Sequence, residues 1–420
     1  MGRRTATSDS APAHTLQIQD LPLDALRPDP ANPRRIADEE LDALTRSIRE
    51  FGLVDPLIAR RDDHTVIGGH QRLVAARRAG LITVPVILLD LSPDRAHLLN
   101  LALNRIGGSW DEPLLARLIA ELDAIPELDL ALTGFSDQEL QSLLLQLEAS
   151  EKQAQPETFD FEAALEGARV SSRVKRGDLW QLGPHRLLCG DSTDPDDVTR
   201  LLEGERAQLA FTDPPYNVAY GDHGGQRRGS RRRRIANDAM SPEQFEVFCR
   251  SWVASLVDHV DGGLYICMSS KEWPLVARLL AEAGAHWSDT IIWAKDRFTL
   301  GRADYQRQYE LIWYGWRAGA EHYWCGDRDQ GDVWEVARPS ASVLHPTMKP
   351  LPLVERALTN SSRPGDRVLD LFLGSGTTLV AAARTARTCL AIELDPIYVD
   401  VAIARWEAFT GEVARRERRR

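Results

Sequence analysis

The sequence has few cysteines and no long hydrophobic run. Its 420 residues include five cysteines, which occur singly and without the paired spacing of a metal site, at positions 189, 249, 267, 325 and 389. No apolar run approaches the roughly 18 residues of a membrane span. The N-terminus carries Arg3 and Arg4 but lacks the apolar segment of a secretion signal. We therefore expect no metal site, no membrane association and a cytoplasmic location.

The sequence also lacks an overall excess of basic residues. It carries 51 Lys and Arg against 62 Asp and Glu, which gives a formal net charge of −11. Residues 1–150 hold 15 basic and 23 acidic side chains, a balance of −8, and the remainder holds 36 and 39, a balance of −3. Basic groups gather in one glycine-rich stretch, at Arg227, Arg228 and 231–234. This stretch suits contacts to phosphates, and it equally fits a solvated loop. The arginine-rich tail 415–420 is typical of a frayed, charged helix end.

A proline-rich tetrapeptide, Asp213-Pro214-Pro215-Tyr216, follows an apolar run at 207–212 that is typical of a short buried strand. Open α/β sheets place their chemistry at the carboxyl ends of such strands. The Asp213 carboxylate and the Pro214 carbonyl are two acceptors for the two hydrogens of an exocyclic amine, and Tyr216 offers a flat face for stacking. An ordinary turn is the alternative for the tetrapeptide alone. The motif indicates a reaction in which such a nitrogen attacks.

A glycine turn near the other end of the chain predicts a nucleotide site. The residues 367–373 read as a strand, Gly374-Ser375-Gly376 as a tight turn and 377–386 as a helix. A second strand, 388–392, ends in Glu393, which is spaced to accept hydrogen bonds from ribose hydroxyls. The third glycine of the dinucleotide fingerprint is missing, so an adenosyl ligand without a pyrophosphate fits better than NAD.

Four motifs in this order resemble those of amino-methylating DNA methyltransferases of the N6-adenine/N4-cytosine family. They are Asp213-Pro214-Pro215-Tyr216-Asn217, His345-Pro346-Thr347-Met348-Lys349-Pro350, the stretch 370–378, and Glu393-Leu394-Asp395-Pro396. The tetrapeptide precedes the glycine loop, as in the beta arrangement of that family, and the resemblance covers roughly residues 172–410. It implies a Rossmann-like, doubly wound α/β sheet, S-adenosylmethionine as the cofactor and double-stranded DNA as the partner.

The resemblance also implies roles for individual residues. Asp213, Pro214 and Tyr216 are expected to be catalytic and to take the target base. The expected cofactor-binding residues lie in the other motifs and after the strand 186–190; they are Asp191, Thr347, Lys349, Asp370, Phe372, Gly374, Gly376, Thr377 and Glu393.

Three of these expected cofactor-binding residues have alternative explanations. Asp191 is expected near the adenine of the cofactor or, alternatively, serves as a turn residue. Thr347 and Lys349 are expected near the methionine part, and ordinary loop packing is the alternative for both.

The identity of the target atom follows from one absence and one residue type. Methylation of a ring carbon needs a cysteine nucleophile, and no cysteine stands in the required context, so direct transfer to nitrogen is expected. The family associates an acidic residue at position 213 mostly with adenine, which favours adenine N6 over cytosine N4. A partition-type DNA-binding protein with a non-catalytic methylase domain, and an RNA or protein amino-methylase, remain alternatives. The oligomeric state is open between monomer and homodimer.

The N-terminal residues 15–110 form a separate, smaller α+β unit. A Gly68-Gly69 turn precedes an amphipathic helix at 70–80, and 84–89 supplies the next strand; this pattern resembles the N-terminal domain shared by ParB partition proteins and sulfiredoxin. In ParB relatives the corresponding loop binds nucleotide phosphates, which implies a nucleotide site at Gly68, Gly69 and Arg72. No cysteine precedes position 189, which excludes the sulfiredoxin reaction, and His70-Gln71 replaces the usual Glu-Arg. These departures favour a DNA-positioning or protein-docking role.

The remaining organisation follows from composition. We expect a helical extension at 111–148, a linker at 149–171, a methyltransferase domain at 172–410 and a basic tail at 411–420. Trp293 and Trp313 lie in strand-like runs and are expected in the core. Trp324 and the polar segment 319–331 suit a short DNA-reading insert. Three nearby arginines either pair with guanine edges or cover a solvated loop; they are Arg297, Arg302 and Arg307.

Overall fold

The structure, a computed structural model, describes residues 16–36, 38–104, 109–153, 159–218, 237–299, 304–326, 330–337 and 348–417. The chain divides into two compact units, Met1–Leu147 and Glu148–Arg420. Within the described ranges, no helix combines the length and the hydrophobicity needed to cross a bilayer.

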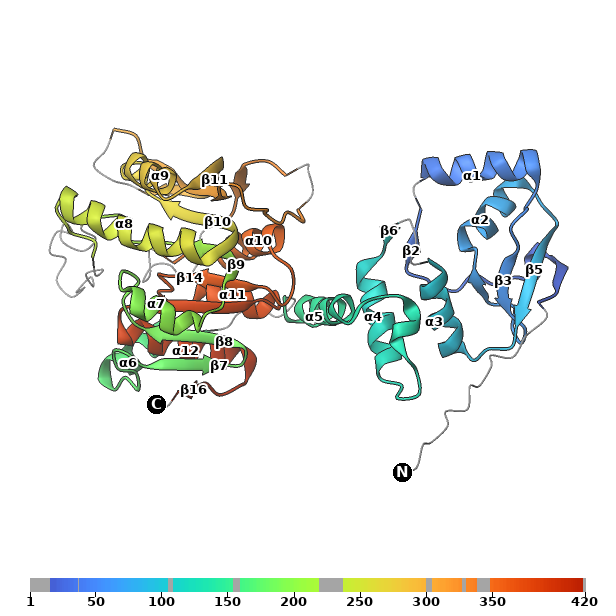
Figure 1. Cartoon of the computed structure of the whole chain (residues 1–420), viewed down its shortest axis with the longest axis horizontal. Helices are drawn as coiled ribbons and strands as arrows, with labels where there is room; N and C mark the ends of the chain where they lie inside the picture. The colour runs from blue at the N-terminus through green and yellow to red at the C-terminus, as the bar shows by residue number, and fades with distance from the viewer. Residues whose placement is uncertain are drawn as a thin grey trace, which may run out of the picture. The chain divides into compact units, whose positions relative to one another are not determined.

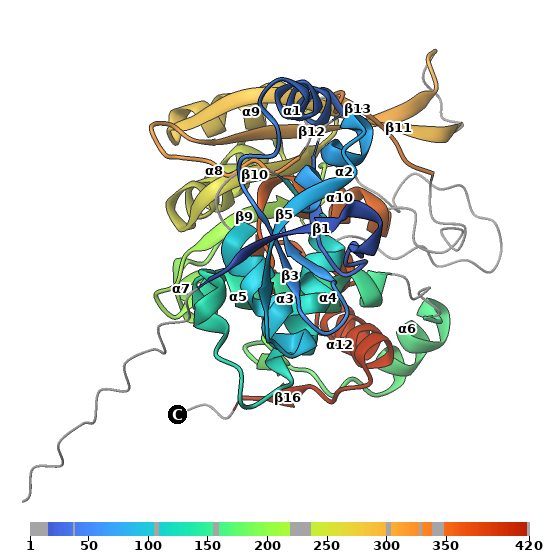
Figure 2. The same cartoon turned by 90° about the vertical axis from the view of Figure 1, so that its right-hand side faces the viewer.

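The N-terminal unit contains a four-stranded sheet in the order β1-β5-β3-β4. Its neighbouring strands β1 (Ile18–Pro22), β5 (Thr83–Leu89) and β3 (Leu57–Arg60) can be followed in Figure 2, and β4 (Val66–Gly68) pairs with β3. The predicted turn and helix are confirmed, since α2 (His70–Ala79) begins directly after Gly69. Leu57, Leu73 and Val86 are fully buried between this helix and the sheet.

The other elements of this unit are mostly helical, including those within 111–148, where a helical extension was expected. They are η1 (Leu23–Ala25), β2 (Arg34–Arg35), α1 (Asp38–Phe51), α3 (Pro93–Asn104), β6 (Ser109–Trp110), α4 (Glu112–Asp123), η2 (Leu130–Thr133) and α5 (Asp137–Gln153). Asp111 caps α4, with its side chain accepting from the Leu114 amide. A cluster that includes Leu101, Ile119 and Leu122 joins α3 to α4.

The C-terminal unit is built on a ten-stranded sheet in the order β13-β11-β12-β10-β9-β14-β15-β8-β7-β16. The labelled strands β11, β10, β9, β14, β8, β7 and β16 follow one another from top to bottom in Figure 1. The five central strands are parallel: β10 (Val260–Met268), β9 (Ala207–Thr212), β14 (Arg367–Asp370), β15 (Thr388–Glu393) and β8 (His185–Cys189). The remaining strands are β11 (Ala285–Thr299), β12 (Arg307–Arg317), β13 (Val333–Glu335), β7 (Leu179–Leu182) and β16 (Arg415–Arg416). Most of the central residues are buried because both faces of a parallel sheet are covered.

Helices cover both faces of this sheet. One buried cluster packs against α7 (Pro195–Leu202), α8 (Pro242–His259) and α9 (Trp273–Glu282). The other packs against α10 (Leu351–Ser361), α11 (Thr377–Arg384) and α12 (Pro396–Thr410). The fold is therefore the Rossmann-like, doubly wound α/β arrangement that the sequence predicted. A capping box begins α8, since the Ser241 side chain accepts from the Gln244 amide and the Gln244 side chain accepts from the Ser241 amide.

Two segments differ from the sequence expectations. Within the predicted linker, the described residues 161–170 form the helix α6 (Phe161–Val170), capped by Asp160, and the Arg405 guanidinium of α12 lies 4.9 Å from the Phe161 ring centroid. The described part of the tail is not a frayed helix end, because α12 ends at Thr410 with Gly411 as its C-cap, and Arg415 and Arg416 pair with β7 as β16. The open edge of β7 offers backbone partners that local sequence patterns do not reveal.

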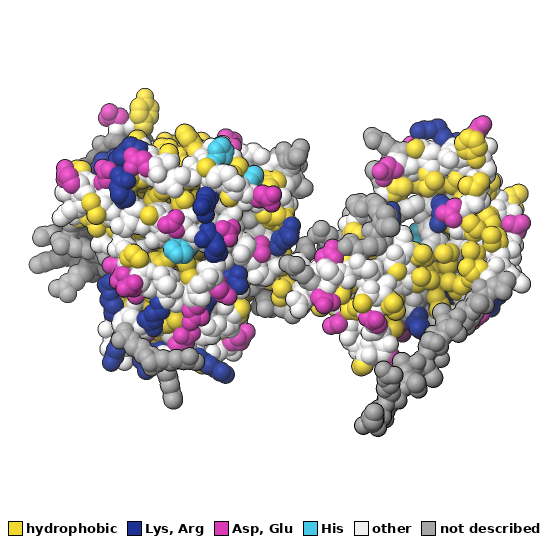
Figure 3. Space-filling model, viewed as in Figure 1, with side chains coloured by type: hydrophobic (Ala, Val, Ile, Leu, Met, Phe, Trp, Pro, Cys, Tyr) yellow, Lys and Arg dark blue, Asp and Glu magenta, His cyan; other side chains and the backbone are white. Residues whose placement is uncertain are grey.

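Charge is mixed over the surface of the C-terminal unit. On the face drawn in Figure 3, Lys and Arg side chains alternate with Asp and Glu side chains over this unit. The arginine stretch at 227–234 lies outside the described residues. On this face, basic and acidic side chains are therefore interspersed, and neither sign forms a continuous patch.

Candidate active site

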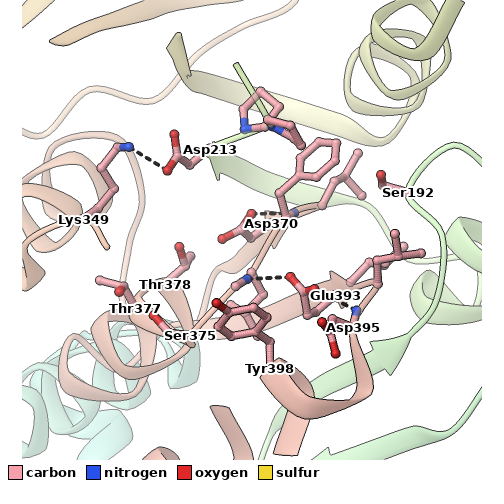
Figure 4. A pocket seen from close by; sticks show the side chains of 18 of the residues that line it. Ser192, Asp213, Lys349, Asp370, Ser375, Thr377, Thr378, Glu393, Asp395 and Tyr398 are labelled. Carbon is pink, nitrogen blue, oxygen red and sulfur yellow. Dashed lines mark hydrogen bonds and ion pairs between the residues drawn. The ribbon is translucent and has the colours of Figure 1, made fainter. Parts of the chain in front are cut away.

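One cavity of about 310 Å³ is lined by both halves of the predicted site. Asp213, Pro214 and Tyr216 line it from the end of β9, and Phe372, Gly374 and Glu393 line it from the ends of β14 and β15. Figure 4 shows Asp213 and Lys349 at one end and Glu393 and Tyr398 at the other, with Asp370 between them. The acidic tetrapeptide and the glycine turn thus line one cavity.

The two motifs meet because β9 and β14 are adjacent parallel strands. Leu209 pairs with Val368 and Ala210 with Leu369, so both strands end at the same edge of the sheet. The Thr212 hydroxyl donates to Asp370 Oδ1 at 3.0 Å, which ties the two strand ends together. Burial raises the pKa of Asp370 to about 6, despite hydrogen bonds from Thr378, the Phe372 amide and Thr212.

The glycine turn and the end of β15 form the second wall of the cavity. The Glu393 carboxylate accepts from the Gly374 amide at 2.8 Å and from the Asp395 amide at 2.8 Å. A Cβ at Gly374 would meet no protein atom within 4 Å, and the φ of +56° disfavours any side chain there. Burial raises the pKa of Glu393 to about 7, although both amides favour its carboxylate form. A carboxylate with free lone pairs beside a bare glycine wall suits a ligand that offers hydroxyl donors.

The Asp213 carboxylate is held by two polar groups at the other end of the cavity. Lys349 Nζ donates to Asp213 Oδ2 at 2.6 Å, and the Tyr216 hydroxyl donates to Asp213 Oδ1 at 2.7 Å. Burial and the neighbouring Glu310 carboxylate raise the pKa of Asp213 more than the Lys349 ammonium lowers it. Each carboxylate oxygen keeps a second lone pair, so both can still accept from a further donor.

Two charged residues that the sequence motifs did not reveal complete this cluster. Glu310 Oε2 lies 3.0 Å from Lys349 Nζ, and Glu310 Oε1 lies 2.5 Å from Lys295 Nζ. Burial opposes ionisation of Glu310, but Lys349 and Lys295 outweigh it and lower its pKa to about 2. Both residues sit in strands whose other inward-facing residues are apolar. That interruption of a core pattern is the sequence signal by which they could have been found.

The other expected cofactor residues divide into three groups. Asp191 and Thr377 line the cavity, as does Lys349. Asp191 also stabilises the turn in which it lies, because its Oδ1 accepts from the Thr193 amide and hydroxyl. Gly376 is not part of the cavity wall; a Cβ there would lie 3.0 Å from Ala402 Cβ, so this glycine permits close packing of α11 on α12. Thr347 lies outside the described residues.

Comparison with known families places these features in context. The family model described as DNA methylase matches residues 207–404, which span β9 to α12. This range contains the tetrapeptide, the buried lysine and the glycine turn that meet in the cavity.

Residues 207–404 form a DNA methylase domain of the N6/N4 family.

The N-terminal residues also match described families. The ParB N-terminal domain matches residues 7–104, and the ParB-methyltransferase HTH domain matches residues 113–173. The chain therefore carries a ParB N-terminal domain and an HTH domain ahead of its methylase domain. The HTH match overlaps both the predicted helical extension and the range expected to be a linker.

Similar proteins include two curated type II methyltransferases. M1.MboII of Moraxella bovis is 25% identical over 263 residues, which are 52% of this chain and 94% of the relative. M2.DpnII of Streptococcus pneumoniae is 28% identical over 227 residues, which are 49% of this chain and 85% of the relative.

Two solved structures are also similar to the chain. The M1.HpyAVI complex with SAM has a TM-score of 0.42 and 22% identity, covering 52% of this chain and 98% of its own. The cytosine-N4-specific PvuII DNA methyltransferase has a TM-score of 0.41 and 16% identity, covering 57% and 94%.

In the ParB N-terminal domain, the expected nucleotide loop is engaged internally. Arg72 Nη1 donates to the Asp55 carbonyl at 2.9 Å and to the Pro56 carbonyl at 3.3 Å, and the guanidinium also pairs with the Asp55 carboxylate. Burial lowers the pKa of His70 to about 4 although Asp29 raises it, so this residue is neutral at neutral pH. Near this loop, the His70 imidazole is therefore neutral and the Arg72 guanidinium is already paired with Asp55.

Burial decides the expectations for two of the tryptophans. Trp293 and Trp313 are buried, which confirms that they belong to the core, and Cys267 and Cys389 are buried as well. Trp324 is 38% exposed, and its segment contacts α10 through the Cys325 amide, which donates to the Asn360 carbonyl. Arg297 is exposed beside Asp296, and Arg302 lies outside the described residues.

The Tyr216 ring and hydroxyl can be separated by substitution. We expect Tyr216→Phe to keep the stacking face and to lower the single-turnover rate by about tenfold, because the hydroxyl contacts with Asp213, Glu310 and Lys349 are lost. Tyr216→Ala also loses the ring, whose stacking is worth roughly 1–3 kcal/mol, so we expect a loss of about 100-fold. The measurement is single-turnover methyl transfer to DNA. A Phe variant that is as slow as the Ala variant would show that the hydroxyl, and not the ring, accounts for the loss of rate.

Proposed function

We propose that this protein transfers a methyl group from S-adenosylmethionine to the exocyclic N6 amine of adenine in double-stranded DNA. The observation that carries the proposal is the shared cavity, in which the Asp213 and Tyr216 end faces the Gly374 and Glu393 end. S-adenosylmethionine is the methyl donor of the DNA methylase family. When bound it would supply a methyl group on a positively charged sulfur, and that sulfur would keep the electron pair of the C–S bond as the amine takes the methyl.

The glycine end of the cavity fits this cofactor. Glu393 would accept from the ribose hydroxyls through the lone pairs that its two backbone amides leave free. Gly374 would let the backbone approach the ligand closely, and Phe372, Asp370 and Thr377 would complete that wall. Asp191 would lie at the adenine end.

At the other end, chain residues would hold and activate the target base. The Asp213 carboxylate and the Pro214 carbonyl would accept the two amine hydrogens, which favours the pyramidal nitrogen whose lone pair attacks. Tyr216 would stack on the extruded base, returning part of the few kcal/mol that unstacking costs. The methylated nitrogen is positively charged until it loses a hydrogen, and Asp213, with its raised pKa, would accept that proton.

Adenine is preferred over cytosine because position 213 is acidic, in line with the resemblance. Cytosine N4 is the second candidate, since both amines present the same two hydrogens to the same acceptors. The test is incubation of unmethylated genomic DNA with the protein and labelled cofactor, followed by digestion to nucleosides and mass spectrometry. Labelled N6-methyldeoxyadenosine supports the proposal, labelled N4-methyldeoxycytidine replaces it with the second candidate, and label in neither opposes both.

For the N-terminal domains we infer a DNA-positioning role. The neighbouring HTH match and the engagement of Arg72 by Asp55 support it, and the balance of −8 over residues 1–150 limits the number of phosphate contacts. Titration of the full chain with a fluorescent nucleoside triphosphate tests the alternative. Saturable binding that Arg72→Ala removes would favour a nucleotide site instead.

Cofactor affinity should depend on pH through Glu393. Its pKa is raised from 4.5 to about 7 in the folded domain without ligand. The protonated form therefore contributes to the stability of that domain fully below about pH 4.5, and the contribution is lost as the pH rises through about 7. Ribose donors need the carboxylate, so binding releases a proton below pH 7, and affinity falls up to about tenfold per unit of decreasing pH.

Calorimetry between pH 5.5 and 8.5 measures this dependence. Glu393→Gln should bind the cofactor more weakly than the wild type at pH 8. Its affinity should also depend less steeply on pH, and the dependence that remains should come from Asp370. Equal affinity of the wild type at pH 5.5 and 7.5 would contradict the assignment.

A further inference from the structure

The charged cluster beside the tetrapeptide extends beyond the residues that face the target base. Glu310 on β12 lies opposite Trp293 on β11, and Lys295 is two residues further along β11, on the same side of that strand. The side chains of Lys349, Lys295 and Glu310 are 6%, 11% and 22% exposed. Glu310 therefore bridges two buried ammonium groups, one of which also holds Asp213.

The four ionised side chains of this cluster balance in charge. Two carboxylates, Asp213 and Glu310, meet two ammonium groups, Lys349 and Lys295. The other titratable groups near Asp213 are Tyr216, Cys267 on β10 and Asp370 on β14. Burial raises the pKa of Tyr216 and of Cys267 well above their ordinary values, so both are neutral at neutral pH. Asp370, whose pKa of about 6 leaves it ionised at neutral pH, lies outside these four side chains and accepts from the Thr212 hydroxyl and the Phe372 amide, which stabilise its charge.

We propose that Glu310 and Lys295 are positioning residues that keep the Asp213 site electroneutral and hold Lys349 between two anions. The inference rests on the proposed function, because methyl transfer moves a positive charge from sulfur onto the amine that Asp213 holds. A net positive cluster opposes that movement, and a protonated Asp213 cannot accept the amine hydrogens. Only the balanced cluster avoids both conditions.

Removing either residue unbalances the cluster in a different direction. Glu310→Gln leaves two ammonium groups with one carboxylate, so positive charge faces the developing cation at every pH. Lys295→Met leaves two carboxylates on one ammonium, which raises the pKa of Asp213 and protonates it earlier. The double variant keeps only the neutral pair of Asp213 and Lys349.

A double-mutant cycle on the full chain tests the proposal. We expect Glu310→Gln to lower the single-turnover rate, at saturating DNA and cofactor, by about 100-fold. Lys295→Met should lower the single-turnover rate about tenfold at pH 7, and the rate should recover at pH 9. The reason is that the acid limb, the part of the pH profile in which the rate falls as Asp213 becomes protonated, moves to higher pH. In Glu310→Gln the acid limb moves to lower pH. The double variant should be more active than either single variant, because neutrality is restored.

A purely structural role gives a different outcome. Losses that multiply in the double variant, with acid limbs that stay in place, would overturn the proposal. If Glu310→Gln does not fold, Lys295→Met and the double variant still form the decisive comparison. The matched control is the pair Lys271 and Glu272, whose Nζ to Oε1 distance is 3.3 Å. Lys271→Met, Glu272→Gln and their double should leave the rate and the acid limb unchanged.

Failure of this inference is distinguishable from failure of the proposed function. A wild-type protein that labels no DNA nucleoside counts against methyl transfer itself. An active wild type whose cycle is multiplicative counts only against the charge-balancing role of Glu310 and Lys295.

Discussion

Asp213→Ala should abolish methyl transfer, with a loss of at least about 1,000-fold in the single-turnover rate, while cofactor affinity changes by less than about threefold. The expected loss is large because one carboxylate accepts an amine hydrogen, faces the developing cation and receives the proton. Cofactor binding should persist because Glu393, which accepts from the Gly374 amide, lies at the other end of the cavity (Figure 4). The measurement is labelled methyl incorporation into DNA beside calorimetric cofactor titration.

Asp213→Asn separates charge from shape in the same experiment. The amide keeps the volume and one acceptor oxygen, but it no longer neutralises Lys349. We expect a loss nearly as large as that of Ala, together with a melting temperature closer to the wild type. Undiminished turnover in the Ala variant would refute the catalytic role of Asp213.

Lys349→Met should give the largest loss of stability, about 3–5 kcal/mol at neutral pH. Its ammonium lies 2.6 Å from Asp213 Oδ2 and 3.0 Å from Glu310 Oε2, and the side chain is 6% exposed. Without it, two partly buried carboxylates face each other and the pKa of each rises. Denaturant unfolding of both proteins measures the difference in free energy.

The sign of the pH dependence identifies the cause of that loss. Carboxylates with raised pKa values favour folding when they are protonated, so the deficit of Lys349→Met should be greatest above pH 7 and smaller at pH 5. The exposed Lys271→Met is the matched control and should change stability by less than about 0.5 kcal/mol. A deficit that is the same at both pH values would point to lost packing rather than unpaired charge.

The local motifs were predictable because short-range chemistry specifies them. The apolar run at 207–212 became the strand β9 with the predicted bounds. Ser241 likewise caps α8 together with Gln244, which lies three residues further on. The glycine turn before α11 and the carboxylate at the end of β15 likewise follow from backbone conformation and hydrophobic pattern. Each of these features is decided within about ten residues of chain.

The polar environment of Asp213 was not predictable in the same way. Lys349 was expected near the methionine part of the cofactor, yet its ammonium donates to Asp213 and Tyr216. Glu310 and Lys295 reach the site only through the register of β11 against β12. A shift of β11 by one residue against β12 would place Lys295 and Glu310 on opposite faces of the sheet.

By itself the sequence determined the strands, turns and caps, and with them the chemical types at each end of the cavity. Only the tertiary structure decided that β9 and β14 are neighbours, which brings Thr212 to within 3.0 Å of Asp370 across 158 positions of sequence. The physical reason is that local preferences act over a few residues. Strand order and register depend instead on how the two buried faces of the sheet pack against helices from the whole chain.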